Sequence, residues 1–309
     1  MRVAQRMSVI GTETAFEVSA RARALQAEGR DIIHLQIGEP DFDTPANVRE
    51  AAKRALDEGA THYAPYPGIP ALREAIADDA QARKGFPVTP DRVFVTVGGK
   101  GVMLYAILGL IDPGDEVLVP DPGYPIYESL TRFVGGTPIP VPIRMENDFR
   151  IDLDELASLV TRKARMLVIN SPANPTGGVL TRSDLEAIAE IAIRHDLVVL
   201  DDEIYGRILY DDEEHVSIAS LPGMAERTIV LDGFSKTFGR SLTEPTRRRR
   251  PPTGAQRRTR GSARAPSSGS PASSRTRCGC GSCPRPRRPF RRARTRLPRA
   301  AADRPARRP

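Results

Sequence analysis

Lys236 lies just after a short apolar run, and a lysine amine in such a position can act as a nucleophile. The run, residues 228–231 (TIVL), is typical of a buried strand, and Asp232 and Gly233 interrupt it. Partial burial at the carboxyl end of a strand removes water from an ammonium group, which lowers the pKa of a lysine. The neutral amine can attack an aldehyde and form a Schiff base. Most lysines near strand ends are solvated surface groups, so Lys236 alone indicates catalysis only weakly.

Two other segments carry groups that suit an anionic ligand. Residues 98–101 (GGKG) join an expected strand to an expected helix, where backbone N–H groups and the helix dipole favour a phosphate, although a Gly-rich turn is more often only a tight turn. Asn174 lies in N-P-T-G-G after another expected strand and could donate to an anionic oxygen. The alternative is a Pro/Gly turn in which Asn174 is a local cap.

An acidic and two aromatic residues complete the set. Asp202 follows a buried strand, where a carboxylate needs a cationic partner, but a helix cap or an ordinary salt bridge would also explain it. Tyr205 is three residues further on, and Tyr124 lies in another loop at a strand end. Either tyrosine could simply belong to the core.

The elements that must position these residues alternate between strands and helices. Apolar strands followed by helices predict an open, largely parallel α/β sheet, in which ligands bind beyond the carboxyl ends of the strands. Thr44 is expected to cap a helix that begins at Pro45, and Asp152 and Thr181 are expected to begin helices in capping boxes. The expected strands are 93–97, 116–119, 137–143, 166–170, 197–200 and 228–231. The expected helices include 14–28, 71–83, 102–111 and 126–133.

The charge of the chain is divided unevenly. Residues 245–309 contain 21 Arg, no Lys and one acidic residue, a net charge of +20, so residues 1–244 carry −13 of the overall +7. The large apolar residues of this tail are Phe290 and Leu297 alone, too few to offset the entropy of ordering, so the tail is predicted to be disordered.

The cysteines also fall in the tail. Cys278, Cys280 and Cys283 form half of a metal-site pattern without a second ligand pair, so they are interpreted as incidental and no metal is expected. Residues 1–244 contain no cysteine, which agrees with a cytoplasmic location. No signal peptide and no membrane-spanning run are expected.

Several motifs together resemble a known family. The order and spacing are similar to those of the pyridoxal-phosphate (PLP) aminotransferases of class I/II, the fold type I family typified by aspartate aminotransferase, over about residues 8–240. The segments that carry the resemblance are G-E-P-D-F (38–42), Y-A-P-Y-P-G-I-P-A-L-R (63–73), D-P-G-Y-P-I-Y (121–127), N-P-T-G-G (174–178), D-D-E-I-Y (201–205) and D-G-F-S-K-T-F (232–238).

The resemblance implies a role for each matching residue. Lys236 would hold PLP through a Schiff base and move a proton, and Asp202 would pair with the pyridine nitrogen. Asn174 and Tyr205 would hydrogen-bond the phenolic oxygen of the cofactor, and Tyr124 would stack on its ring. The remaining matches are Gly99, Lys100 and Gly101 around the phosphate, Tyr63 reaching the phosphate of a partner subunit, and Gly38 at the substrate carboxylate.

The implied protein is a homodimeric transaminase with amino acid and 2-oxo acid substrates. Residues 1–40 would form an N-terminal arm and part of a small domain, and residues 41–244 an incomplete PLP-binding large domain. The pattern stops soon after Phe238: the arginines with which the family binds the phosphate and the substrate carboxylate have no matching positions, and residues 245–309 are interpreted as a product of a shifted reading frame. The alternatives are a PLP-dependent carbon–sulfur lyase and a regulator whose basic tail binds nucleic acid.

Overall fold

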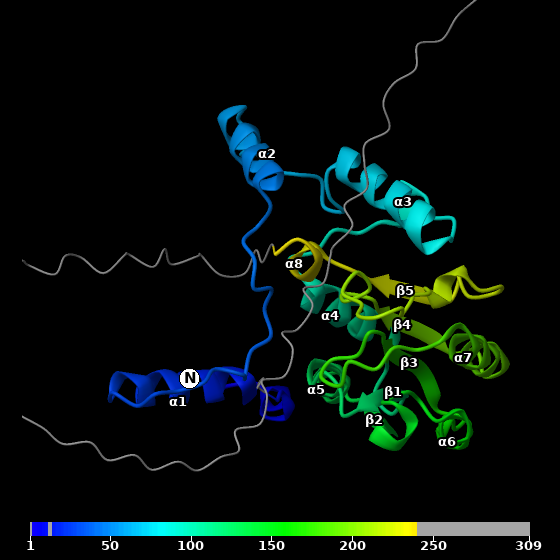
Figure 1. Ribbon diagram of the computed structural model, residues 1–309. Helices are drawn as coiled ribbons and strands as arrows, with labels where there is room; N and C mark the ends of the chain where they lie inside the picture. Colours follow the sequence, from blue (N-terminus) through cyan, green and yellow to red (C-terminus); the bar gives the residue numbers. More distant parts are fainter. Residues whose placement is uncertain (1, 12–13, 240–309) are drawn as a thin grey trace, which may run out of the picture. The chain divides into compact units, whose positions relative to one another are not determined.

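A parallel sheet of five strands positions the residues singled out above. In the computed structural model, which describes residues 2–11 and 14–239, the strand order is β2-β1-β3-β4-β5 and every pair is parallel (Figure 1). The strands are β1 (Glu116–Asp121), β2 (Thr137–Pro142), β3 (Ala164–Asn170), β4 (Val198–Asp202) and β5 (Thr228–Leu231). The prediction of a largely parallel α/β sheet is therefore confirmed.

Helices cover both faces of this sheet. α4 and α5 lie on one face, and α6 and α7 lie on the other (Figure 1). The α-helices are α1 (Thr14–Ala27), α2 (Ala46–Asp57), α3 (Pro70–Lys84), α4 (Gly99–Leu110), α5 (Ile126–Phe133), α6 (Leu153–Leu159), α7 (Arg182–Arg194) and α8 (Phe234–Thr237). Four short 3₁₀ helices accompany them: Gln5–Val9, Pro90–Arg92, Met145–Asn147 and Ile218–Ser220.

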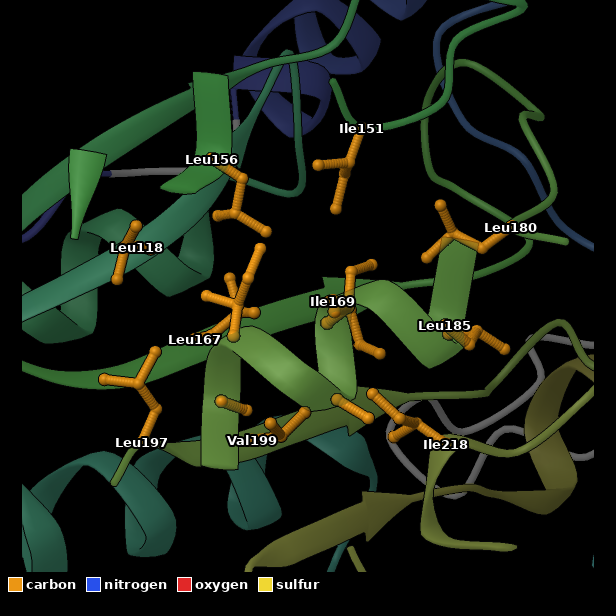
Figure 2. Packing of buried hydrophobic residues seen from close by; sticks show 14 of the residues in the cluster. Leu118, Ile151, Leu156, Leu167, Ile169, Leu180, Leu185, Leu197, Val199 and Ile218 are labelled. Carbon is orange, nitrogen blue, oxygen red and sulfur yellow. The ribbon is translucent and has the colours of Figure 1, made fainter. Parts of the chain in front are cut away.

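Alternate residues of the strands enter two separate cores. Leu167 and Val199 point into the core beneath α6 and α7, which Figure 2 shows with Leu156 and Leu185 from these helices. Val168 and Leu200, their neighbours in the chain, enter the core beneath α4 and α5. Strands buried on both faces explain why they read as continuous apolar runs in the sequence.

Parallel pairing brings the carboxyl ends of the strands to one edge of the sheet. Asn170, the last residue of β3, is paired with Asp202, the last residue of β4. Asp202 in turn is paired with Leu231, the last residue of β5. The segments that follow these strands, including the one with Lys236, consequently begin side by side.

Two local predictions are wrong. Residues 93–97 are not a strand: Val97 is 76% exposed, and the N–H of Val95 donates to the carbonyl of Pro67 rather than to a neighbouring strand. An extended segment becomes a strand only when a partner completes its hydrogen bonds. Thr44 does not cap α2, because its hydroxyl donates to the carbonyl of Gly239 and Pro45 occupies the cap position.

The predicted helix starts near residues 152 and 181 are confirmed. At α7 the capping box is complete, since Thr181 Oγ1 accepts from the N–H of Asp184 and the Asp184 carboxylate accepts from the N–H of Thr181. At α6, Asp152 caps the N–H of Glu155, but the carboxylate of Glu155 binds Arg144 instead of completing the box.

The described residues belong to a single compact unit. None of their helices is long and apolar enough to cross a membrane. The tail at residues 245–309, its three cysteines and the interpretation of its reading frame lie outside the described residues. The proposed division near residue 40 stays a prediction.

We predict that Ile188→Ala lowers the free energy of unfolding by about 2 to 5 kcal/mol, because the side chain is completely buried against the sheet. Ile193→Ala, on the same helix at 45% exposure, is the control and should cost less than about 1 kcal/mol. Urea denaturation of the two variants measures the difference, and equal losses would contradict the assignment of the core face.

Candidate active site

Among the polar residues predicted from the sequence to form the site, Asp202 is the most deeply buried. It lies at the carboxyl edge of the sheet. The residue is 3% exposed, its Oδ2 accepts a hydrogen bond of 2.6 Å from the hydroxyl of Tyr127, and its Oδ1 accepts one of 3.2 Å from the N–H of Ile204. Burial raises the pKa of Asp202 to about 6, even though the hydrogen bond from Tyr127 acts in the opposite direction. Asp202 is therefore an anion at neutral pH that a cationic ligand would stabilise.

Asn170 fixes the backbone around this carboxylate. Its side-chain N–H donates to the carbonyl of Asp202 at 2.8 Å, and its Oδ1 accepts from the N–H of Asn174 at 2.8 Å. Asn174, predicted to bind the cofactor, is thus held next to the end of β3 by the side chain of Asn170. The structure brings Asn174 and Asp202 to the same edge of the sheet through one shared partner.

The amine of Lys236 lies at the same edge, in the short helix α8 that follows β5. Its Nζ donates to the carbonyl of Gly38 at 2.8 Å and lies 5.6 Å from the centroid of the Tyr205 ring. Gly38 and Lys236 are 198 residues apart in the chain, so the predicted substrate-binding and catalytic residues meet in the structure.

The ring of Tyr205 lies beside the Lys236 amine, and its hydroxyl is influenced by the charge of Asp202. Burial and then the negative charge of Asp202 raise the pKa of Tyr205, so its hydroxyl keeps its proton and remains a donor. Tyr124 packs edge-on against Tyr127, with ring centroids 5.8 Å apart. Tyr124 therefore packs against the tyrosine whose hydroxyl binds Asp202.

The glycine-rich segment forms the start of α4. Gly98 has a φ of +74°, which favours glycine, and it precedes the helix without a side-chain cap. A Cβ atom on Gly101 would lie 3.0 Å from the Cβ of Thr96, and one on Gly99 would lie 3.3 Å from Leu231 Cδ2. Both glycines thus let the helix start close to its neighbours, with its positive dipole end at this edge.

Two further predicted residues lie at the start of α4 and in the loop before α3. The ammonium of Lys100 lies 5.8 Å from the centroid of the Phe16 ring, toward α1. The side chain of Tyr63 is fully exposed in the loop before α3. Both roles stay predictions.

The sequence analysis missed three residues that hold the site together. Tyr127 and Asn170 bind Asp202 directly, and Lys84 forms ion pairs with the residues that follow β4 and β5. A signal existed for Tyr127, since a tyrosine on the apolar face of an expected helix must find a partner for its hydroxyl. No pattern in the sequence singled out Lys84.

The comparisons with known proteins agree with this geometry. The profile of the family described as "Aminotransferase class I and II" matches residues 30–241. The chain belongs to this family. An aspartate aminotransferase of Pyrococcus abyssi is 49% identical over 210 residues, which cover 68% of this chain and 54% of the relative. An arginine–pyruvate transaminase of Pseudomonas aeruginosa is 43% identical over 223 residues, covering 72% of this chain and 56% of the relative.

A solved structure shares the fold as well. The aspartate aminotransferase of Thermus thermophilus with maleate superposes with a TM-score of 0.74 at 40% identity, over 77% of this chain and 62% of that one. This aminotransferase chain thus spans a little more than half the length of the relatives it matches. Enzymes of the family use PLP. These comparisons give no support to the carbon–sulfur lyase or to the nucleic-acid-binding alternative.

The residues present fit PLP. A buried carboxylate suits a protonated ring nitrogen, a lysine amine suits an aldehyde, and the start of a helix of 12 residues suits a phosphate. Asp202, Lys236 and α4 supply these three groups at the carboxyl edge of one sheet.

We predict that Tyr127→Phe raises the pKa of Asp202 above about 6, because the variant removes a hydrogen bond that favours the carboxylate. Titration of the labelled side-chain carboxyl carbon by NMR measures this pKa in the cofactor-free protein. Tyr210→Phe, an exposed tyrosine, is the control and should leave it unchanged. An unchanged pKa in Tyr127→Phe would show that the hydroxyl does not act on Asp202.

Proposed function

We propose that this chain acts in PLP-dependent transamination between an amino acid and a 2-oxo acid. One observation carries the proposal: the buried Asp202 carboxylate ends β4, the Lys236 amine follows the adjacent strand β5, and the ring of Tyr205 lies 5.6 Å from that amine. Membership of the aminotransferase family supports it. The relatives named above are an aspartate aminotransferase and an arginine–pyruvate transaminase, so their names do not single out one donor amino acid for this chain.

Each residue of the site has a defined task in such a reaction. Bound PLP supplies an electron sink for negative charge that develops at Cα of the substrate. Asp202, held by Tyr127, would keep a positive ring nitrogen in place and shielded from water. Lys236 would attach the cofactor and later carry a proton to and from the substrate on Nζ. Tyr205 and Asn174 would donate hydrogen bonds to the phenolic oxygen of the cofactor.

The backbone would bind the two anionic ends. The start of α4, at Gly99, Lys100 and Gly101, would hold the phosphate, because N–H groups there lack helical partners and the dipole is positive. The substrate carboxylate would lie against the backbone at Gly38, which already touches Lys236. Tyr124 would stack on the cofactor ring.

We further propose a homodimer in the cytoplasm. Tyr63 is fully exposed in its own chain, as expected of a residue that reaches the phosphate in a partner subunit. The absence of cysteine from residues 1–244 supports a reducing compartment.

We predict that PLP forms a covalent bond with Lys236. Incubation with PLP, reduction with borohydride and peptide mass spectrometry should locate the label on Lys236, and Lys236→Ala should abolish both the label and amino transfer to 2-oxo acids. Lys53→Ala, which removes an exposed surface lysine, should keep both. Labelling spread equally over surface lysines would contradict the proposed site.

We predict that two defective variants complement each other. Lys236→Ala lacks the amine and Tyr63→Ala lacks the residue donated to the partner, so neither homodimer should bind PLP well. After mixing and reassociation, a random hybrid dimer has one intact site, which restores about a quarter of the wild-type sites. Titration with PLP measures this fraction. Tight binding by Tyr63→Ala alone would contradict the shared site.

A further inference from the structure

The ammonium of Lys84 is buried between two carboxylates behind the candidate active site. Lys84 is the last residue of α3, and its side chain is 5% exposed. Its Nζ forms an ion pair with Glu203, whose side chain is completely buried, and another of 2.8 Å with Asp232. Lysine and glutamate side chains are rarely this deeply buried unless they form an ion pair.

The two carboxylates belong to the segments that carry the reactive groups. Glu203 directly follows Asp202 at the end of β4, and Asp232 directly follows β5, four residues before Lys236. Because side chains alternate along a strand, Asp202 points toward Tyr127 whereas Glu203 points to the opposite face. Lys84 therefore connects the ends of β4 and β5 from the face that the cofactor groups do not use.

Opposite charges on Lys84 and on the carboxylates of Glu203 and Asp232 stabilise this connection. Burial alone would lower the pKa of Lys84, but the charges of Glu203 and Asp232 outweigh it and raise the pKa, so Lys84 is a cation. Burial also opposes the charge of Glu203, but the ring of His215, 3.3 Å away, and the charge of Lys84 lower its pKa, so Glu203 is an anion. Burial and then the charge of Glu203 raise the pKa of Asp201, which lies beside this pair.

Few other cations near this cluster could replace Lys84. Arg83 lies 3.8 Å from Asp232, but its guanidinium is engaged with Asp79. The ring of His215 lies 3.3 Å from Glu203 on the other side. Loss of Lys84 would leave the buried Glu203 carboxylate without this ion pair and would release Asp232 from its 2.8 Å contact.

We propose that Lys84 is a positioning residue for the cofactor site, which holds the segment 232–238 against the end of β4 so that Lys236 and Asp202 stay in register. The inference rests on the proposed function for its effect on PLP, but not for its effect on the backbone. Lys84 touches neither the reacting amine nor the Asp202 carboxylate, and it acts through Asp232 and Glu203.

Amide hydrogen exchange of the full chain tests the inference without the cofactor. In Lys84→Met, which keeps the length of the side chain and removes its charge, the segment 232–238 should exchange at least about ten-fold faster than in the wild type. Lys53→Met removes an exposed ion pair with Glu50 and is the matched control, with no expected change. Lys84→Arg, which restores the charge, should recover most of the protection.

A double-mutant cycle separates positioning from general loss of stability. Asp232→Asn removes the ion pair with Lys84 and the longer 3.8 Å contact with Arg83, and it leaves Lys84 neutralised by Glu203, so this milder variant should fold and should still loosen the segment 232–238. If the two residues act through one contact, the double variant should exchange hardly faster than Lys84→Met alone. Full additivity, or unchanged exchange in Asp232→Asn, would overturn the inference.

Titration with PLP then connects the inference to the site. Lys84→Met should bind PLP about ten-fold more weakly and Lys84→Arg should bind nearly as well as the wild type. Wild-type affinity in Lys84→Met would overturn the role at the cofactor site while leaving the proposed function intact. A wild type that does not bind PLP, with faster exchange in Lys84→Met, would overturn the proposed function and keep the role in positioning the segment.

Discussion

The burial of the Asp202 carboxylate is the constraint around which the carboxyl edge of the sheet is built. A carboxylate that loses its water must be compensated by hydrogen bonds or by a cation. Tyr127 and the N–H of Ile204 provide the hydrogen bonds, and Asn170 holds the backbone beneath. What these neutral donors cannot supply is a positive charge, and this is the property that a protonated pyridine ring brings.

The alternation of side chains at the end of β4 places Asp202 in different surroundings from its neighbours Asp201 and Glu203. Asp202 faces Tyr127 and is an anion at neutral pH with a raised pKa. Glu203 faces Lys84 and its pKa is lowered, whereas burial and the charge of Glu203 raise the pKa of Asp201. Asp202 and Glu203 are consecutive residues, but their side chains point to opposite faces. The carboxylate that faces the site is therefore separated from the ion pair that joins the structural elements.

Most of the sheet could be predicted from the sequence because its strands are buried on both faces. Five of the six expected strands form, since each finds a neighbour among the described residues. Residues 93–97 have the same apolar pattern but pair with no described strand, and pattern alone cannot reveal a missing partner. The prediction that Thr44 caps a helix was wrong for a similar reason. A hydroxyl that can cap a helix can equally bind a distant carbonyl, here that of Gly239.

The site was predictable where its residues follow strands, and it was not where they come from elsewhere. Asp202 ends β4, and Asn174 and Lys236 follow β3 and β5, so the parallel sheet alone brings them to one edge. Their chemical roles came from the resemblance, which the comparisons with known aminotransferases support at the level of the family. Lys84 escaped notice because it ends a helix more than a hundred residues before its partners, and only the folded chain shows that contact.

The order of the strands also determines when the site can exist during synthesis. β3, β4 and β5 each pair with a strand made earlier in the chain, so the sheet can lengthen one strand at a time as the polypeptide emerges from the ribosome. The Asp202 carboxylate can be enclosed by Tyr127 before Lys236 has emerged from the ribosome. In a growing chain, the surroundings of the Asp202 carboxylate can therefore form first, and Lys236 joins them only after β5, the last strand of the described sheet.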